Sequence, residues 1–147
     1  MIVVDTNVIA SLLLPTSQHT EAAMNLLKAD RDWAAPLLWR SEFCNMLATG
    51  VRNEWMTEEQ ATAALVSAEE VMDGGEYSVP IGAVLRTANA SKCTAYDSEF
   101  VVLAQDLGVK LVTLDRAVLK AFPDVAVSLI LYAPHGRGRV EPGRARI

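Results

Sequence analysis

The sequence predicts an α/β domain, a three-layer sandwich in which helices cover both faces of a mostly parallel sheet. Short apolar segments alternate along the chain with longer segments of helical periodicity, an order typical of parallel sheets. A length of 147 residues favours a single domain, and 51% hydrophobic residues are enough to form its core. We expect this domain to span residues 1–134 and the Arg- and Gly-rich residues 135–147 to form a mobile tail.

The predicted strands are short runs of apolar and branched residues that end near turn-forming residues or carboxylates. They cover residues 1–5 (MIVVD), 33–36 (WAAP), 77–81 (YSVPI), 110–115 (KLVTLD) and 125–131 (VAVSLIL). Pro80 makes the third of these the weakest prediction, because proline has no N–H to donate to a sheet.

The segments between the strands have the periodicity of amphipathic helices. We predict helices over residues 6–14, 18–29, 37–53, 57–72, 82–92, 95–107 and 116–122. Thr57 and Gln60 have the spacing of a capping box, and Thr94 precedes Asp97 by the same interval. Gly108 is a typical residue at which the helix over 95–107 would end.

Charge and cysteine content limit the possible functions. The net charge is −5, and because residues 135–147 contain four Arg and one Glu, residues 1–134 carry −8. That sign disfavours nucleic-acid binding by charge alone, although a bound metal ion would reverse it locally. Cys44 and Cys93 fit neither a disulfide framework nor a zinc motif. With no apolar run of about 18 residues and no signal-peptide pattern, we expect a cytoplasmic protein without a membrane span.

Two predicted strands end in an aspartate, Asp5 and Asp115. In open parallel sheets the functional site lies at the carboxyl ends of the strands, so both residues are candidates for it. Each could equally cap the helix that follows, because an aspartate oxygen accepts hydrogen bonds from free helical N–H groups. The occurrence of two such residues in one small domain favours the functional interpretation.

Asp97 and Glu42 lie on predicted helices. Asp97 could help to start the helix over 95–107, a structural role that does not exclude metal binding. At about 100° per residue, Glu42 falls between Leu38 and Met46, inside the apolar arc of its helix. An unpaired carboxylate there would cost several kcal/mol, roughly, and Arg40 lies on another side of the helix. The other alternative is that Glu42 lies at the edge of the apolar stripe. We expect a Glu42 at the buried edge that faces a shared cation.

Four carboxylates that converge at one edge of a sheet repel each other unless protons or a metal ion neutralise them. Their oxygen atoms suit Mg²⁺ or Mn²⁺ better than zinc. Such a centre can activate water and stabilise the leaving oxygen in phosphodiester hydrolysis. Asp5, Glu42, Asp97 and Asp115 therefore predict a metal-dependent hydrolase.

Four segments, VVDTNVIASLLLP, RSEFCNML, TAYDSEFVVLAQ and LVTLDRAVLKAFP, together resemble the PIN-domain ribonucleases, and in particular the VapC-type toxins of toxin–antitoxin pairs. The resemblance covers residues 1–131 and matches the four carboxylates to the four acidic positions of the family. It implies a PIN-like fold, an RNA substrate, a homodimer and a neutralising antitoxin protein. It also places beside the acids the polar residues Thr6, Asn7, Thr113 and, less specifically, Ser98, which could orient carboxylates or water.

Other interpretations stay open. Phosphoryl transfer of the haloacid-dehalogenase type needs a second Asp where this chain has Asn7, and a receiver-type phosphoacceptor needs an Asp that YSVPIG lacks. The same fold could instead be a non-catalytic binding module that acts with a partner protein.

Some residues outside the acidic set are candidates for contacts with other molecules. The candidates for contacting the substrate strand are Arg40, Arg86, Lys92 and Arg116. The candidate for the dimer interface is the segment of residues 57–72. The Arg-rich end could bind RNA phosphates, contact a partner or be solvated.

Overall fold

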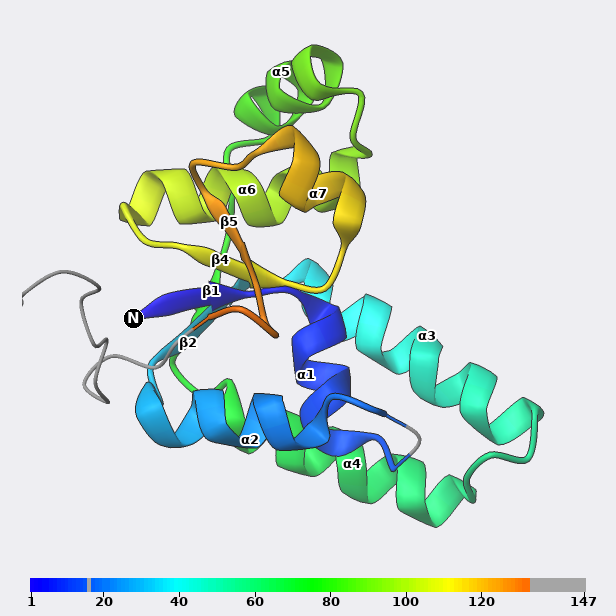
Figure 1. The fold of residues 1–147 in the computed structure, drawn as a ribbon. Coiled ribbons are helices and arrows are strands. Elements are labelled where there is room, and N and C mark those ends of the chain that lie inside the picture. The colour runs from blue at the N-terminus through cyan, green and yellow to red at the C-terminus, as the bar shows by residue number, and fades with distance from the viewer. Residues whose placement is uncertain (16, 133–147) are drawn as a thin grey trace, which may run out of the picture.

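The structure is a computed structural model that describes residues 1–15 and 17–132 (Figure 1). Its strands are β1 (Ile2–Val4), β2 (Trp33–Pro36), β3 (Glu76–Tyr77), β4 (Leu111–Thr113) and β5 (Ala126–Ser128). Its helices are α1 (Thr6–Leu13), α2 (Thr20–Ala29), α3 (Leu38–Arg52), α4 (Glu58–Val71), α5 (Ile81–Ser91), α6 (Ala95–Leu107) and α7 (Arg116–Ala121). The predicted tail, residues 135–147, lies outside the described residues.

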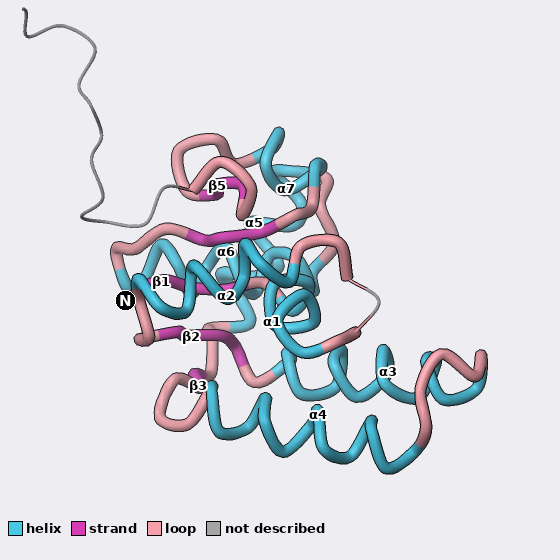
Figure 2. The backbone as a smooth tube through the Cα atoms, turned by 60° about the horizontal axis from the view of Figure 1, so that its bottom comes forward, coloured by secondary structure: helices cyan, strands magenta, loops and turns pink. Residues whose placement is uncertain are grey.

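The five strands form one parallel sheet in the order β3-β2-β1-β4-β5, as the traced backbone shows (Figure 2). This confirms the predicted parallel α/β architecture. From β1 the chain first builds the sheet toward β3, and later returns to the other side of β1 with β4. Neighbouring strands β1 and β4 therefore mark the point where the strand order reverses, the usual place for a binding site in such sheets.

Helices cover both faces of the sheet, as predicted (Figure 1). Helix α6 packs against β1, β2 and β4 on one face, with α5 outside it. Helix α1 lies on the other face and contacts α2, α3 and α4. The central strands are buried between these layers, with Val3, Val4 and Leu111 all 0% exposed. Within the described ranges, no helix has the length and apolar character needed to cross a membrane.

Four of the five predicted strands are shorter in the structure, and the third and the fifth differ most. The prediction for residues 77–81 is wrong beyond Tyr77, because β3 ends there and Pro80 is the N-cap of α5. Proline has no N–H for a sheet, and it suits a helix start. Strand β5 ends at Ser128, not at residue 131. Its neighbour β4 ends at Thr113, whose carbonyl accepts from Leu129 N–H at 3.1 Å, so the residues beyond have no strand to pair with.

Gly75 allows the edge strand β3 to pair closely with β2. A Cβ atom at this position would lie 1.9 Å from the carbonyl oxygen of Trp33, so any larger residue would push β3 away from β2. The Gly75 carbonyl accepts a hydrogen bond from Ala35 N–H at 2.9 Å. This close approach determines where the following residue, Glu76, enters the sheet.

Candidate functional site

Asp5 lies at the reversal point of the sheet, between the carboxyl end of β1 and the start of α1. The last residue of the neighbouring strand β4 is Thr113, and its Oγ1 donates a hydrogen bond to Asp5 Oδ2 at 2.7 Å. The backbone N–H of Asp5 donates to the carbonyl of Val112 at 3.0 Å. The parallel pairing of β1 with β4 therefore brings together two residues that are far apart in the sequence.

The Thr113 hydroxyl is completely buried, and its hydrogen-bonding capacity is fully used. Besides donating to Asp5, Oγ1 accepts from the Asn7 side-chain amide (3.3 Å) and from the Asp115 backbone N–H (3.0 Å). The Asn7 Oδ1 atom in turn accepts from Leu114 N–H at 3.1 Å. With both lone pairs occupied, the single hydroxyl proton of Thr113 is directed at Asp5.

Glu42 reaches the same region from α3. Thr6 Oγ1, which is buried at the start of α1, donates to Glu42 Oε1 at 2.9 Å. The prediction that Glu42 lies inside the apolar arc of its helix is wrong. The buried stripe of α3 runs along Trp39, Phe43 and Leu47, so Glu42 lies at its half-buried edge.

Electrostatics identify Asp5 as the most perturbed carboxylate. Burial of its carboxylate raises the pKa of Asp5 from 3.8 to about 6. The nearby charges of Glu42 and Asp97 contribute to this rise, and hydrogen bonds from Thr113 and from the Thr6 backbone oppose it, so that about 6 is the net result. Burial also raises the pKa of Glu42, as does the charge of Asp97.

No basic residue compensates these charges in the part of the chain that the structure describes. There, no Lys or Arg forms an ion pair with Asp5, Glu42 or Asp97. Three carboxylates from a strand end and two helices thus influence each other without a protein countercharge. Such uncompensated clusters are more typical of functional sites than of structural ion pairs.

Asp97 and Ser98 belong to the first turn of α6. The expected cap is present, with the Asp97 backbone N–H donating to Thr94 Oγ1 at 3.0 Å. The cap uses the Asp97 backbone, while the Asp97 carboxylate acts on Asp5 and Glu42 through its charge. The buried Ser98 hydroxyl donates to the Thr94 carbonyl at 2.8 Å, a contact within its own helix.

Asp115 caps α7, which was the structural alternative for this residue. Its Oδ1 atom accepts hydrogen bonds from Ala117 N–H (2.8 Å) and Val118 N–H (3.2 Å). Asp115 is connected to the other candidates through its backbone N–H, which donates to Thr113. A cap of this kind still leaves a carboxylate capable of binding a cation.

Glu99 is a further carboxylate that the sequence reasoning missed. Burial raises its pKa, and its charge contributes to the raised pKa of Glu42. Glu99 directly precedes the apolar run at residues 100–104 and lies between two residues that the structure buries, Ser98 and Phe100. A glutamate at such a position is costly to bury unless a partner or solvent reaches it.

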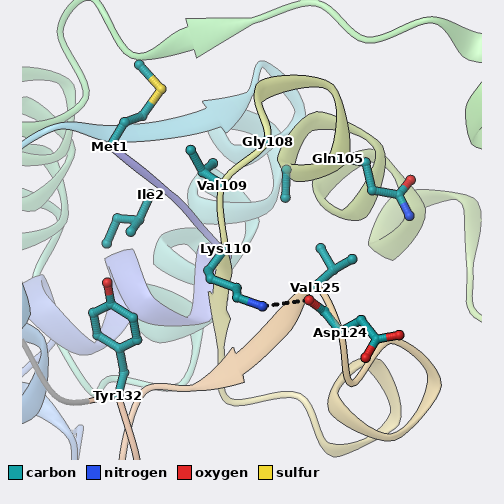
Figure 3. A pocket seen from close by; sticks show the side chains of 10 residues that line it. Met1, Ile2, Gln105, Gly108, Val109, Lys110, Asp124, Val125 and Tyr132 are labelled. Atoms are coloured by element: carbon teal, nitrogen blue, oxygen red, sulfur yellow. Dashed lines mark hydrogen bonds between the residues drawn. The ribbon is translucent and has the colours of Figure 1, made fainter.

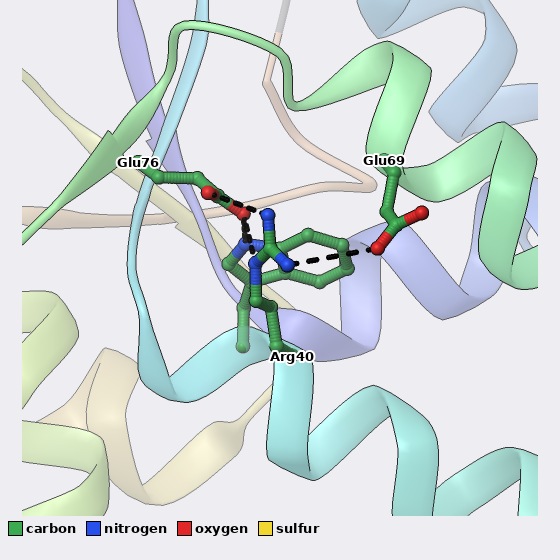
Figure 4. A network of polar contacts seen from close by, with 4 residues as sticks. Arg40, Glu69 and Glu76 are labelled. Atoms are coloured by element: carbon green, nitrogen blue, oxygen red, sulfur yellow. Dashed lines mark hydrogen bonds and ion pairs between the residues drawn. The ribbon is translucent and has the colours of Figure 1, made fainter.

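Arg40 was a candidate for contacting the substrate, but its side chain is held by carboxylates in this structure (Figure 4). Its guanidinium binds Glu76 through two hydrogen bonds and lies 3.6 Å from Glu69. Arg86, Lys92 and Arg116 are all exposed.

Asp5, Glu42 and Asp97 fit a divalent metal ion in their chemistry. They provide only oxygen donors, which suits a hard cation such as Mg²⁺ or Mn²⁺. Within residues 1–15 and 17–132, however, no three acidic, His or Cys side chains are arranged as a complete ligand set. Binding would therefore require the carboxylates to adjust around the ion.

A cavity of about 450 Å³ lies at the other edge of the sheet, away from these carboxylates (Figure 3). It is lined by Met1, Lys110, Val125 and Tyr132, among others. Lys110 Nζ donates to the backbone carbonyl of Asp124 at 2.6 Å. None of the candidate site residues lines this cavity.

Comparison with known proteins identifies the family. The model of the PIN domain matches residues 2–126. Ribonuclease VapC3 of Pyrobaculum aerophilum is 28% identical over 125 residues, which cover 83% of this chain and 95% of that protein. The crystal structure of PAE2754 from Pyrobaculum aerophilum has a TM-score of 0.71 at 23% identity and covers 88% of this chain and 90% of that one.

A second solved structure, FitAcB from Neisseria gonorrhoeae, has a TM-score of 0.68 at 16% identity and covers 90% of this chain and all of that one. FitAB bound to an IR36 DNA fragment has a TM-score of 0.69 at 17% identity, with 92% of this chain and all of that one covered. At such low identities the solved structures show a common fold and no more. Because the family model spans most of the sequence, the chain belongs to the PIN-domain family.

Proposed function

We propose that the protein is an endoribonuclease that hydrolyses RNA phosphodiester bonds with Mg²⁺ or Mn²⁺ as its cofactor. The observation that carries this proposal is the crowding of the Asp5 carboxylate by Glu42 and Asp97, without a basic partner among the described residues. A bound cation would relieve that repulsion. Membership of the PIN-domain family and similarity to a protein named ribonuclease VapC3 support RNA as the substrate.

Four carboxylates would hold the metal: Asp5, Glu42, Asp97 and Asp115. Bound there, Mg²⁺ or Mn²⁺ would supply the positive charge that activates water and offsets the negative charge developing on the phosphodiester. The protein's own contribution is to orient two of these carboxylates. Asp5 is oriented by the Thr113 hydroxyl and Glu42 by the Thr6 hydroxyl.

Asn7 has a supporting role in this proposal. Its amide donates to Thr113 and its carbonyl oxygen accepts from Leu114 N–H, so Asn7 connects the start of α1 to the end of β4. This connection keeps the hydroxyl proton of Thr113 directed at the Asp5 carboxylate. Ser98 supports the site through the first turn of α6, which carries Asp97.

In the cell, the protein would act as the toxin of a toxin–antitoxin pair, as the similarity to VapC3 favours. Its partner would be a small antitoxin protein that covers the carboxylate edge and blocks RNA. We also propose a homodimer, for which the exposed apolar positions of α4, such as Val66, offer one contact region.

The test is RNA cleavage by purified protein in EDTA, Mg²⁺ or Mn²⁺, with two matched variants of α6. Asp97→Asn removes a carboxylate of the cluster, whereas Asp106→Asn removes an exposed carboxylate at the other end of the same helix. We expect metal-dependent cleavage that Asp97→Asn abolishes and Asp106→Asn retains.

Cleavage that persists in EDTA, or that survives Asp97→Asn, would contradict the proposed site. Absence of metal binding by the wild-type protein, measured by Mn²⁺ titration, would favour the non-catalytic binding module instead. Such a module has no need for a cation at these acids.

A further inference from the structure

Helix α3 carries Glu42, yet nothing in its own sequence fixes the beginning of the helix. The N-cap residue is Leu37, which makes no side-chain hydrogen bond to the helix, and the first turn contains no acidic residue. The free N–H groups of an uncapped end make it prone to fraying unless tertiary contacts hold it. The position of Glu42 therefore depends on what the first turn of α3 contacts.

That turn is attached to the edge of the sheet by three side chains, Trp39, Arg40 and Glu76, which we call the Glu76 clamp (Figure 4). Arg40 binds Glu76 with two parallel bonds, Nε to Oε1 at 2.6 Å and Nη2 to Oε2 at 2.9 Å. The buried Trp39 donates from Nε1 to Oε1 at 2.8 Å. A two-bond Arg–carboxylate contact defines orientation as well as distance, unlike a single ion pair.

Glu76 is a rigid anchor because the sheet holds it. Within β3 it lies opposite Ala35 of β2 in the parallel ladder, and the close approach at Gly75 leaves no room for β3 to shift inward. The backbone N–H of Leu37 also donates to the Tyr77 carbonyl at 3.0 Å. Hydrogen bonding from Arg40 lowers the pKa of Glu76, so the anchor stays charged.

Glu42 follows Arg40 by two residues on the same helix and meets Thr6 of α1 at 2.9 Å. We propose that Arg40 is a positioning residue, which through Glu76 fixes the first turn of α3 to the sheet and thereby keeps Glu42 against the Thr6 hydroxyl. The importance of this for catalysis rests on the proposed function, because a displaced carboxylate loses its place in the metal site.

The first experiment does not depend on nuclease activity. It is a double-mutant cycle of melting temperatures, with Arg40→Met to break the clamp and Thr6→Val to remove the contact with Glu42. If the clamp holds Glu42 against Thr6, the decrease in Tm of the double variant is smaller than the sum of the decreases of the two single variants. Additive losses would overturn the proposal.

The second experiment measures Mn²⁺ affinity by titration. Arg40→Met should weaken binding by roughly tenfold, as expected when a group that orients a metal ligand is lost. Arg40→Lys should recover only part of the affinity, because an ammonium group cannot form the two parallel bonds. Unchanged affinity in Arg40→Met would also overturn the proposal.

Two controls separate positioning from general loss of stability. Glu69→Gln removes only the 3.6 Å contact of Arg40, and Lys110→Met removes a polar contact at the opposite edge of the sheet. Both should bind Mn²⁺ within about twofold of the wild-type affinity, as exposed polar contacts contribute little. A wild-type protein that binds no Mn²⁺ would refute the proposed function, while the melting cycle would still decide the role of the clamp.

Discussion

The two edges of the parallel sheet both carry carboxylates, but their surroundings are opposite. At the carboxyl edge, Asp5 is buried beside Glu42 and Asp97, and these neighbours together with burial raise its pKa to about 6. At the amino edge, the charged N-terminus of the chain lies 3.1 Å from Asp30 and 3.8 Å from Asp32. Like charges meet at the first edge and opposite charges at the second.

This difference separates the edge that we propose as the functional site from the edge at which ion pairs are formed. At the amino edge, Asp30 and Asp32 form ion pairs with the N-terminal ammonium group. The 450 Å³ cavity lies at this edge, where the carboxylates already have a countercharge. At the carboxyl edge, burial and the charges of Glu42 and Asp97 disfavour the ionised form of Asp5, and a bound cation would offset this effect. None of the candidate site residues lines that cavity, so the charge pattern, and not the cavity, points to the edge at the strand-order reversal.

The largest expected effect is that of Asp5→Asn, which removes the central charge of the carboxyl edge. Cleavage should fall by roughly a thousandfold or more, a typical loss when an essential catalytic group is removed. The metal-free protein should melt at a higher temperature at pH 7, because a buried carboxylate with a raised pKa destabilises the folded state when ionised. Cleavage assays and thermal melts in EDTA measure both. A lower melting temperature would show that the Asp5 carboxylate stabilises the fold.

Thr113→Val should have the next largest effect, because it removes the hydroxyl that orients Asp5. We expect cleavage to decrease by about 10- to 100-fold. Stability should decrease by about 1–3 kcal/mol, since the Asn7 amide and the Asp115 N–H lose their buried acceptor. Urea unfolding measures the stability change. Thr62→Val, which removes an exposed hydroxyl from α4, is the matched control and should change neither quantity.

Changes of pH test the same comparison. Because folding raises the pKa of Asp5 to about 6, metal-free stability should decrease as pH rises from about 4 to above 6. Measured as the difference between the wild-type protein and Asp5→Asn, which share all other titrating groups, the decrease should reach on the order of 2–3 kcal/mol. Mn²⁺ affinity should follow the opposite trend, falling about tenfold per unit below pH 6 as protons compete with the metal. A difference between the wild-type protein and Asp5→Asn that rises with pH would mean that the ionised Asp5 carboxylate is stabilised in the fold, which would contradict the described electrostatics.

The smallest effect is expected at the amino edge. Lys110→Met breaks the exposed 2.6 Å hydrogen bond to the Asp124 carbonyl. Cleavage and Mn²⁺ affinity should stay at wild-type values, with a small decrease in melting temperature. A large loss of activity in Lys110→Met would mean that the cavity at this edge takes part in function, and the distinction between the two edges would fail.

Much of the architecture was predictable from local patterns. Branched apolar runs that end in a carboxylate identified β1 and β4, and the spacing of Thr94 and Asp97 predicted a cap that the structure confirms. The capping box at Thr57 and Gln60 is likewise present. These features depend on residues only a few positions apart, which is why sequence periodicity reveals them.

The contacts within the candidate site were less accessible to sequence reasoning. The helical wheel placed Glu42 within the apolar stripe, but which side of a helix is buried depends on its neighbours, and α3 buries Trp39 and Phe43 instead. Arg40 was considered as a substrate contact, and its pairing with Glu76 depends on the position of a two-residue strand.

By itself, the sequence determined the alternation of strands and helices, the candidate acidic residues and the capping box of α4, because all of these follow from neighbouring side chains. Only the tertiary structure decided that Thr113 binds Asp5 and that Thr6 binds Glu42. Such pairs are separated by 108 and 36 residues, and the parallel register and helix packing that unite them arise from burial of the whole core.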